Sequence, residues 1–273
     1  MKPTSAPLSR PIPLDAAPMR KGSARMADID PAIRRALDAG SLEAVTLVEA
    51  LVVDHGKLFR SLAPDAGDSA FTAMDRTMDG KITSRMRDSG RILFDTFGLA
   101  VGYDRFVSQR SDTARGWAAS LVGYAPGLSL AERLELIAVL ADDPNAGTRE
   151  WAWMAIRGHI AAELDEAIKQ LIRWAQSPSP NLRRFASEST RPRGVWCTHI
   201  QMLKDHPALA LPLLDPLHAD ESKYVQDSVG NWLNDAAKSQ PDFVTELCRV
   251  WRQESPAKST ERICRRAMRS LTR

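Results

Sequence analysis

The sequence predicts an all-α protein, because its apolar residues have helical spacing, breaks between helices are frequent, and the pattern of strands is missing. Apolar residues recur at intervals of three and four, as in Leu42, Val45, Val48 and Val52, which is the spacing of one helix face. β-branched and aromatic residues do not alternate over consecutive segments, and no Asn-Gly turn joins two such runs.

Caps and breaks delimit the expected helices. Ser129-Leu-Ala-Glu132 precedes an apolar run and has the residues of a capping box, which satisfies N–H groups of a first helical turn. Beyond residue 125 the segments between breaks are short enough for single helices, and the short links predict antiparallel neighbours. The breaks are Pro126-Gly127, Asp143-Pro144, Pro178-Ser-Pro180, His206-Pro207, Ala219-Asp220, Gln240-Pro241 and Ser255-Pro256.

Four of these segments repeat one layout, in which a loop precedes polar or basic residues and then an apolar core. They begin at Thr148, Asn181, Tyr224 and Thr260, so that successive starts are 33, 43 and 36 residues apart. Units of this length are typical of two-helix solenoids of the HEAT kind. We predict a HEAT-like α-solenoid of stacked antiparallel helix pairs, and the uneven spacing leaves an irregular helical bundle as the alternative.

The first 28 residues are expected to lie outside this body. They hold five prolines among scattered Ser, Arg and Lys, and such a segment buries too little apolar surface to offset the entropy of ordering it. We predict a disordered tail over residues 1–28 and a single helical repeat domain over residues 29–273.

Composition narrows the classes of protein. The three cysteines, Cys197, Cys248 and Cys264, are odd in number and lack CxxC spacing, which argues against a disulfide framework or a zinc site and fits a reducing cytoplasm. No apolar run approaches the ~20 residues that a membrane span needs. We expect a cytoplasmic monomer with no membrane contact, no metal and no cofactor.

Basic residues gather in two short stretches, although the net charge of the chain is only +3. The first stretch has a net charge of +3 and contains Arg183, Arg184, Glu188, Arg191 and Arg193. The second covers residues 258–273 and has a net charge of +5. Guanidinium groups bind phosphate in a planar fork, so arginines on one concave face predict a basic groove for a duplex backbone. The alternative is a solvated helix face.

Glu150 stands at the start of its helix, on one face with Trp153, Met154 and Arg157. A carboxylate flanked by tryptophans suits a binding groove. The alternative, which the spacing alone favours, is an acid that the helix dipole stabilises.

The helix that begins at Tyr224 has a polar face. Asp227, Asn231 and Asp235 follow at i, i+4 and i+8, where side chains that compete for the backbone are unfavourable. This polar face has two alternative explanations, which are hydrogen bonds between repeats and a functional role. The turn from Arg191 to Trp196 is also open to two interpretations, since it can hold a phosphate and present an indole, or pack its Trp between repeats.

Two blocks of this sequence resemble a known family. Leu182-Arg-Arg-Phe-Ala-Ser-Glu-Ser-Thr-Arg-Pro-Arg193, with Trp196 after it, resembles the RRFASEGTRPR…W block of the AlkC/AlkD-type DNA alkylation-repair glycosylases. Tyr224-Val-Gln-Asp-Ser-Val-Gly-Asn-Trp-Leu-Asn-Asp235 resembles the YVxxSVxNxLND block, nearer the AlkC branch, and Glu150-Trp151 is similar to the Glu-aromatic pair of that family. Ser189 departs from the pattern, because the family usually has Gly there.

The resemblance implies a solenoid whose concave basic groove binds duplex DNA containing alkylated bases. It implies base excision repair by release of N3- or N7-alkylated purines, such as 3-methyladenine and 7-methylguanine, with no metal or cofactor. The family is also thought to act without flipping the base, unlike most base-excising enzymes.

The resemblance also implies roles for individual residues. Glu150 and Asp235 would be the catalytic carboxylates, Trp151 and Trp196 would pack against the sugar and backbone of the lesion, and the arginines would hold phosphates. The residues expected to contact the DNA or the lesion are Trp151, Trp153, Arg157, Arg183, Arg184, Arg191, Arg193, Trp196 and Asn231.

These residue types suit the chemistry. A purine alkylated at N3 or N7 is cationic, so it can leave without protonation by a general acid. The transition state instead requires stabilisation of an oxocarbenium-like sugar and a water molecule directed at C1′. A carboxylate can provide both, through its charge and as a base. Indole faces attract a cation by about 0.5–2 kcal/mol. Neutral lesions should therefore be poor substrates. The alternatives are a non-catalytic HEAT-like protein that binds DNA or senses damage, and a protein–protein scaffold.

Overall fold

The structure, a computed structural model, describes residues 20–194 and 196–271, and every regular element within these ranges is a helix. The all-α prediction is confirmed. The N-terminal half comprises η1 (Met26–Asp28), α1 (Pro31–Asp38), α2 (Leu47–Val52), α3 (His55–Leu62), α4 (Asp68–Thr77), α5 (Ile82–Phe106) and α6 (Asp112–Tyr124). Gly98 breaks α5 with a φ of 70°, in the left-handed region that favours glycine.

The C-terminal half is a series of helix pairs. The outer and inner helices are, in order, α7 (Leu130–Ala141) and α8 (Ala146–Ala162), then α9 (Leu164–Ala175) and α10 (Pro180–Ser189), and last α14 (Pro241–Glu254) and α15 (Lys258–Ala267). One more repeat lies between the α9–α10 pair and the α14–α15 pair. Its inner helix is α13 (Lys223–Ala237), and its outer helix is divided into α11 (Gln201–Asp205), η2 (Pro207–Ala210), α12 (Leu211–Leu214) and η3 (Asp215–Leu217).

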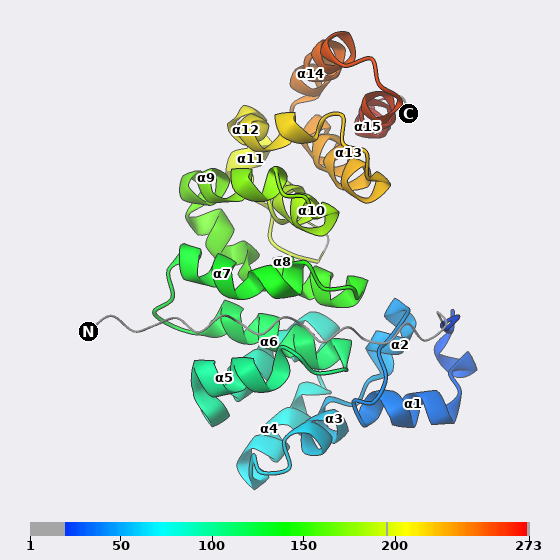
Figure 1. Ribbon diagram of the computed structural model, residues 1–273, viewed down its shortest axis with the longest axis vertical. Coiled ribbons are helices and arrows are strands. Elements are labelled where there is room, and N and C mark those ends of the chain that lie inside the picture. Colours follow the sequence, from blue (N-terminus) through cyan, green and yellow to red (C-terminus); the bar gives the residue numbers. More distant parts are fainter. Residues whose placement is uncertain (1–19, 195, 272–273) are drawn as a thin grey trace.

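The four repeated segments are the four inner helices, which confirms the predicted solenoid of stacked helix pairs. The inner helices contact one another in the order α8, α10, α13, α15, and Figure 1 shows them along one side of the stack with α9, α12 and α14 along the other. The long second interval, from Asn181 to Tyr224, has a local cause, since Pro207, Pro212 and Pro216 divide the outer helix that it contains.

The helix boundaries follow the caps and breaks. All seven breaks fall at junctions between helices, and Pro180, Pro207 and Pro241 are themselves the first residues of helices. At the start of α7, Ser129 Oγ accepts a hydrogen bond from the Glu132 N–H at 3.3 Å, and Glu132 Oε2 accepts one from the Ser129 N–H at 2.8 Å. The capping box is thus present. One apolar cluster runs from Leu37 to Ala267, so both halves share a core.

The predicted tail falls largely on residues 1–19, which lie outside the described residues. Residues 20–28 differ from that expectation, because they contact the body of the protein. Two N–H groups of Arg20 donate to Glu49 at 2.6 and 2.7 Å, and the N–H of Ser23 donates to the same carboxylate at 3.1 Å. Glu49 is fully buried, so this ion pair ties residues 20–23 to α2.

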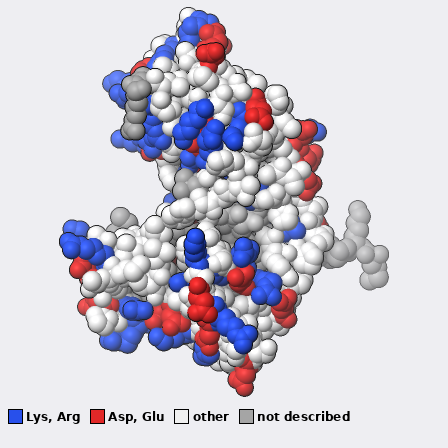
Figure 2. Space-filling model, turned by 180° about the vertical axis from the view of Figure 1, so that it is seen from behind, with Lys and Arg blue, Asp and Glu red and all other residues white. Residues whose placement is uncertain are grey.

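The stack is curved. In Figure 1 the N-terminal helices α1 and α2 face α13 and α15 across an open side, and the space-filling view in Figure 2 shows a hollow there, with Lys and Arg gathered on the C-terminal lobe beside it. Within residues 20–194 and 196–271, no helix combines the length and the hydropathy needed to cross a bilayer.

Candidate functional site

Glu150 lies near the N-terminus of α8 and is held at both carboxylate oxygens. Asn145 caps this helix, with its Oδ1 accepting from the Gly147 N–H at 2.8 Å. Oε2 of Glu150 accepts a hydrogen bond from Nε1 of Trp153 at 2.8 Å, and Oε1 lies 2.6 Å from Nη2 of Arg184. Nevertheless 39% of the Glu150 side chain is exposed. The sequence prediction of a carboxylate flanked by tryptophan therefore has a geometric basis.

Arg184 begins a chain of ion pairs that joins α8, α10 and α13. In this chain Arg184 lies 3.6 Å from Glu188, Arg191 lies 2.7 Å from Glu188, and Arg191 lies 2.7 Å from Asp235. These four side chains are only 5–12% exposed. Together with Glu150 they form what we call the acidic cluster, named for its three carboxylates, which are balanced by two guanidiniums and by the ammonium of Lys238, 3.2 Å from Asp235. Two of its members, Glu150 and Asp235, are the carboxylates that the sequence singled out.

Glu188 is the member of the acidic cluster that the sequence analysis missed, since it was counted only as a charge opposing the arginines. Burial raises the pKa of Glu188, but Arg184, Arg191 and a 2.7 Å hydrogen bond from Ser228 Oγ outweigh burial and keep the pKa below its usual value. Glu188 is therefore ionised at neutral pH. Its spacing, four residues after Arg184 and three before Arg191, would have identified it as a partner of both.

The remaining arginines of the first basic stretch also bond within the protein. Arg183 donates to both carboxylate oxygens of Asp220, at 2.6 and 3.1 Å, and Arg193 donates to the backbone carbonyl of Asp235 and to Ser239. Their partners lie 37–46 residues away. The guanidiniums of Arg183, Arg184, Arg191 and Arg193, which we expected to hold phosphates, are thus occupied by contacts between repeats.

Arg157, another expected DNA contact, is 3% exposed. It donates to the carbonyl of Ser189 at 2.7 Å and to those of Arg191 and Thr198. These carbonyls belong to the end of α10 and to the loop that follows it, so Arg157 fixes this loop against α8 and is buried away from any DNA backbone.

We predict that Arg157→Ala lowers the free energy of unfolding by about 2–4 kcal/mol, because it leaves buried carbonyls without donors. Urea denaturation measures the change. Arg173→Ala, at an exposed position on α9, is the control and should cost less than about 0.5 kcal/mol. An Arg157→Ala protein as stable as this control would refute the role of Arg157 in the loop.

The loop that Arg157 holds presents Trp196. This residue is 61% exposed and has a φ of 62°, a strained conformation for an aromatic residue. The indole is therefore displayed on the surface and is not packed between repeats, which decides between the two interpretations of this turn. Strain of this kind persists only where surrounding contacts impose it, and Arg157 supplies such contacts on both sides of Trp196.

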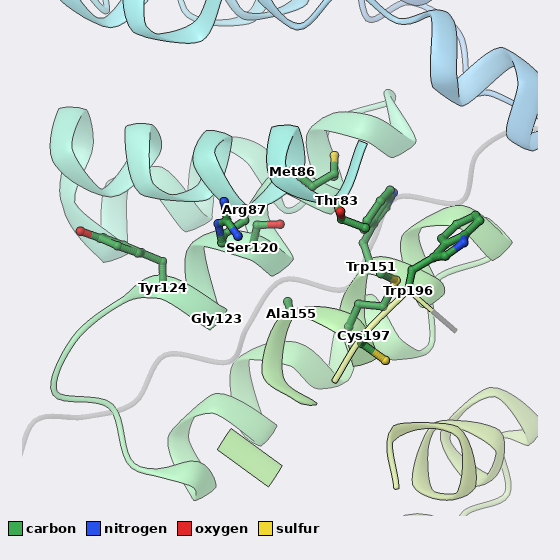
Figure 3. A pocket seen from close by; sticks show the side chains of 11 residues that line it. Thr83, Met86, Arg87, Ser120, Gly123, Tyr124, Trp151, Ala155, Trp196 and Cys197 are labelled. Carbon is green, nitrogen blue, oxygen red and sulfur yellow. The ribbon is translucent and has the colours of Figure 1, made fainter. Parts of the chain in front are cut away.

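Trp196 and Trp151 line one cleft of about 380 Å³, which Figure 3 shows from close by. The cleft brings α5 and α6 of the N-terminal half against α8 and the loop after α10. Arg87 is the one charged side chain in the lining, and nothing in the sequence analysis pointed to it. The lining residues are Thr83, Met86, Arg87, Ser120, Gly123, Tyr124, Trp151, Met154, Ala155, Trp196 and Cys197.

The arginines of the second basic stretch, on α15 and in the turn after it, lie over the polar face of α13. Arg262 and Arg266 share Asp227, at 2.7 and 3.0 Å, and Arg266 also donates to Asn231 at 2.8 Å. Further along, Arg269 donates to Asn234 at 3.1 Å. Bonds between repeats thus account for Asp227 and Asn231. We call Arg262, Arg266 and Arg269 the arginine row. Among the described residues these three guanidiniums have one carboxylate partner, Asp227, so the arginine row and Asp227 together have a net charge of +2.

The described residues contain no group of three or more His, Cys, Asp or Glu side chains that could hold a metal ion. The family model named DNA alkylation repair enzyme matches residues 131–267, which is half of the chain. This chain belongs to the DNA alkylation repair family. The matched segment runs from α7 to the end of α15 and contains the whole acidic cluster, so the resemblance noted in the sequence is confirmed.

Two individual proteins are similar to this member of the alkylation repair family. The uncharacterised protein YhaZ of Bacillus subtilis (strain 168) is 32% identical over 219 residues, which are 78% of this chain and 59% of YhaZ. The solved structure of the alkylpurine DNA glycosylase AlkC of Pseudomonas fluorescens, bound to DNA containing an abasic site analogue, aligns with a TM-score of 0.66 at 23% identity. That alignment covers 89% of this chain and 66% of AlkC. The chain thus spans less than two thirds of either protein and shares the fold of AlkC.

Proposed function

We propose that this chain is a DNA glycosylase that hydrolyses the N-glycosidic bond of cationic N3- or N7-alkylated purines in duplex DNA. The observation that carries the proposal is the state of Glu150, a carboxylate fixed by Trp153 and Arg184 yet 39% exposed. No other carboxylate of the acidic cluster is exposed to this extent, since Glu188 and Asp235 are only 5–6% exposed.

In the proposed reaction a water oxygen attacks C1′ of the damaged nucleotide and the C1′–N bond breaks. The bonding electron pair leaves with the purine and neutralises its positive charge, so the base needs no proton to depart. Glu150 accepts the proton of the water and its charge stabilises the oxocarbenium-like sugar. Glu188 pairs with Arg184 and Arg191, and Asp235 pairs with Arg191, so these two carboxylates hold the guanidinium that orients Glu150.

We place the damaged strand in the cleft between Trp151 and Trp196, with the indoles against sugar and backbone. Arg87, the cation in the cleft lining, is suited to a phosphate and would repel a cationic base, which favours a position of the base near Glu150. The arginine row retains a net charge of +2 and suits the duplex backbone further along the groove.

The arginine row makes DNA binding depend on salt. Replacing Arg266 and Arg269 by Gln should weaken binding to undamaged duplex and reduce the slope of log K against log salt by about 2, one for each lost phosphate contact. Fluorescence anisotropy over a salt series measures the slope. Arg249→Gln, on the outer helix α14 and paired with Glu246, is the matched control. Equal slopes for both variants would remove the arginine row from the DNA-binding surface.

Incubation with duplexes that carry a single 7-methylguanine tests the function, with abasic sites scored by alkaline strand cleavage. We expect the wild-type chain to release the base and to leave the undamaged strand intact. Tight binding without release would identify the non-catalytic alternative, a protein that senses damage. Absence of salt-dependent DNA affinity would instead favour a protein–protein scaffold.

A further inference from the structure

Tyr224, on the first turn of α13, lies between two arginines from two other inner helices. The Cζ atom of Arg184, on α10, is 4.4 Å from the centre of the Tyr224 ring, and that of Arg149, on α8, is 5.1 Å from it. Nε of Arg149 also donates to the Tyr224 hydroxyl at 3.2 Å. One aromatic ring therefore links α8, α10 and α13 at the edge of the acidic cluster.

Both arginines are fixed at their other ends. Arg149 donates to the backbone carbonyls of Asp143 and Pro144, in the loop that precedes α8. Arg184 pairs with Glu150 at 2.6 Å and is only 12% exposed. Arg149 and Arg184 have like charges and would repel each other, whereas the electron-rich face of an aromatic ring attracts a guanidinium. Tyr224 thus allows two cations to lie on neighbouring helices without turning Arg184 away from Glu150.

We propose that Tyr224 is a positioning residue, which keeps Arg184 on Glu150 and so fixes the carboxylate that faces the substrate. This inference rests on the proposed function. Tyr224 acts through Arg184 and contacts neither water nor sugar. Without the ring, Arg184 is no longer held in one direction, and Glu150 loses the cation that orients it.

The proposal predicts a division between rate and affinity. Tyr224→Leu should slow base release under saturating enzyme about tenfold, which is within the range of a cation–π contact, and should leave the Kd for duplex DNA unchanged. Tyr224→Phe keeps the ring face and loses only the hydroxyl contact with Arg149, so its rate should stay within about twofold of wild type. A Phe variant as slow as the Leu variant would overturn the proposal.

A double-mutant cycle shows whether Tyr224 acts through Arg184. The melting temperatures of Tyr224→Leu, Arg184→Met and the double variant are compared, and the double variant should lose less than the sum of the two single losses. The control cycle uses Trp174→Leu with Arg184→Met. Trp174 packs on Phe185 of α10 with ring centroids 4.8 Å apart, and this cycle should be additive. Additivity in the Tyr224 cycle would contradict the link.

The two kinds of readout separate this inference from the proposed function. If the wild-type chain releases no base from any alkylated duplex, the proposed function fails, and the melting-temperature cycle by itself decides whether Tyr224 holds Arg184. If base release occurs, non-additive melting temperatures with an unchanged rate for Tyr224→Leu would refute a positioning role.

Discussion

Replacing Glu150 with glutamine is expected to slow base release at least about 100-fold, the lower range for loss of a catalytic acid–base group. The amide cannot accept the proton of the attacking water and carries no charge to stabilise the sugar. The fold should survive, because the amide oxygen of glutamine can still accept from Trp153 and Arg184 retains Glu188 as a partner. Single-turnover base release from a 7-methylguanine duplex measures the effect.

Affinity for DNA separates this result from a binding defect. The Kd of Glu150→Gln for undamaged duplex should stay within about threefold of wild type, since Glu150 is not a phosphate contact. Glu135→Gln, at an exposed position on the outer helix α7, is the matched control and should keep the full rate. If Glu150→Gln released the base as fast as this control, Glu150 would have no part in the chemistry.

Asp235→Asn is expected to act on stability first, with a loss of about 3 kcal/mol in the free energy of unfolding. Asp235 is 4% exposed, and its Oδ2 accepts two N–H groups of Arg191, at 2.9 and 2.7 Å. Removing its charge leaves the Arg191 guanidinium buried with Glu188 as its remaining ion-pair partner among the described residues. Urea denaturation at neutral pH measures the loss.

The control for Asp235→Asn is Asp104→Asn, at an exposed position on α5, which should change stability by less than about 0.5 kcal/mol. Base release by the Asp235 variant should fall less than that of Glu150→Gln when both are assayed well below their melting temperatures. Full stability with abolished base release would contradict the account, because it would make Asp235 a residue that touches the substrate.

Local signals predicted the helices and their pairing. Prolines, caps and apolar spacing act over one or two helical turns, so the breaks and the capping box at Ser129 could be identified without knowledge of the fold. The inner helices were recognisable because each repeats the same order of loop, polar residues and core. The connection of Glu150 to Asp235 followed from the same repeat, since both stand on inner helices and are joined through Arg184, Glu188 and Arg191.

The partners of charged side chains could not be predicted in the same way. Arg183 pairs with a carboxylate 37 residues away and Arg20 with one 29 residues away, and only the folded stack brings them together. A cluster of arginines in the sequence therefore indicated a phosphate surface where the structure has ion pairs between repeats. The cleft was missed for a related reason, because Arg87 and Tyr124 come from α5 and α6, outside residues 131–267, which the family model matches.

The most direct test of the central claim compares a cationic with a neutral lesion. Duplexes with one 7-methylguanine or one hypoxanthine are incubated with excess wild-type chain, and base release is followed in single turnover. Because the proposed reaction gives the departing base no proton, the account predicts release of 7-methylguanine and no release of hypoxanthine above the uncatalysed rate. Equal release of both bases, or binding of both with release of neither, would contradict the account.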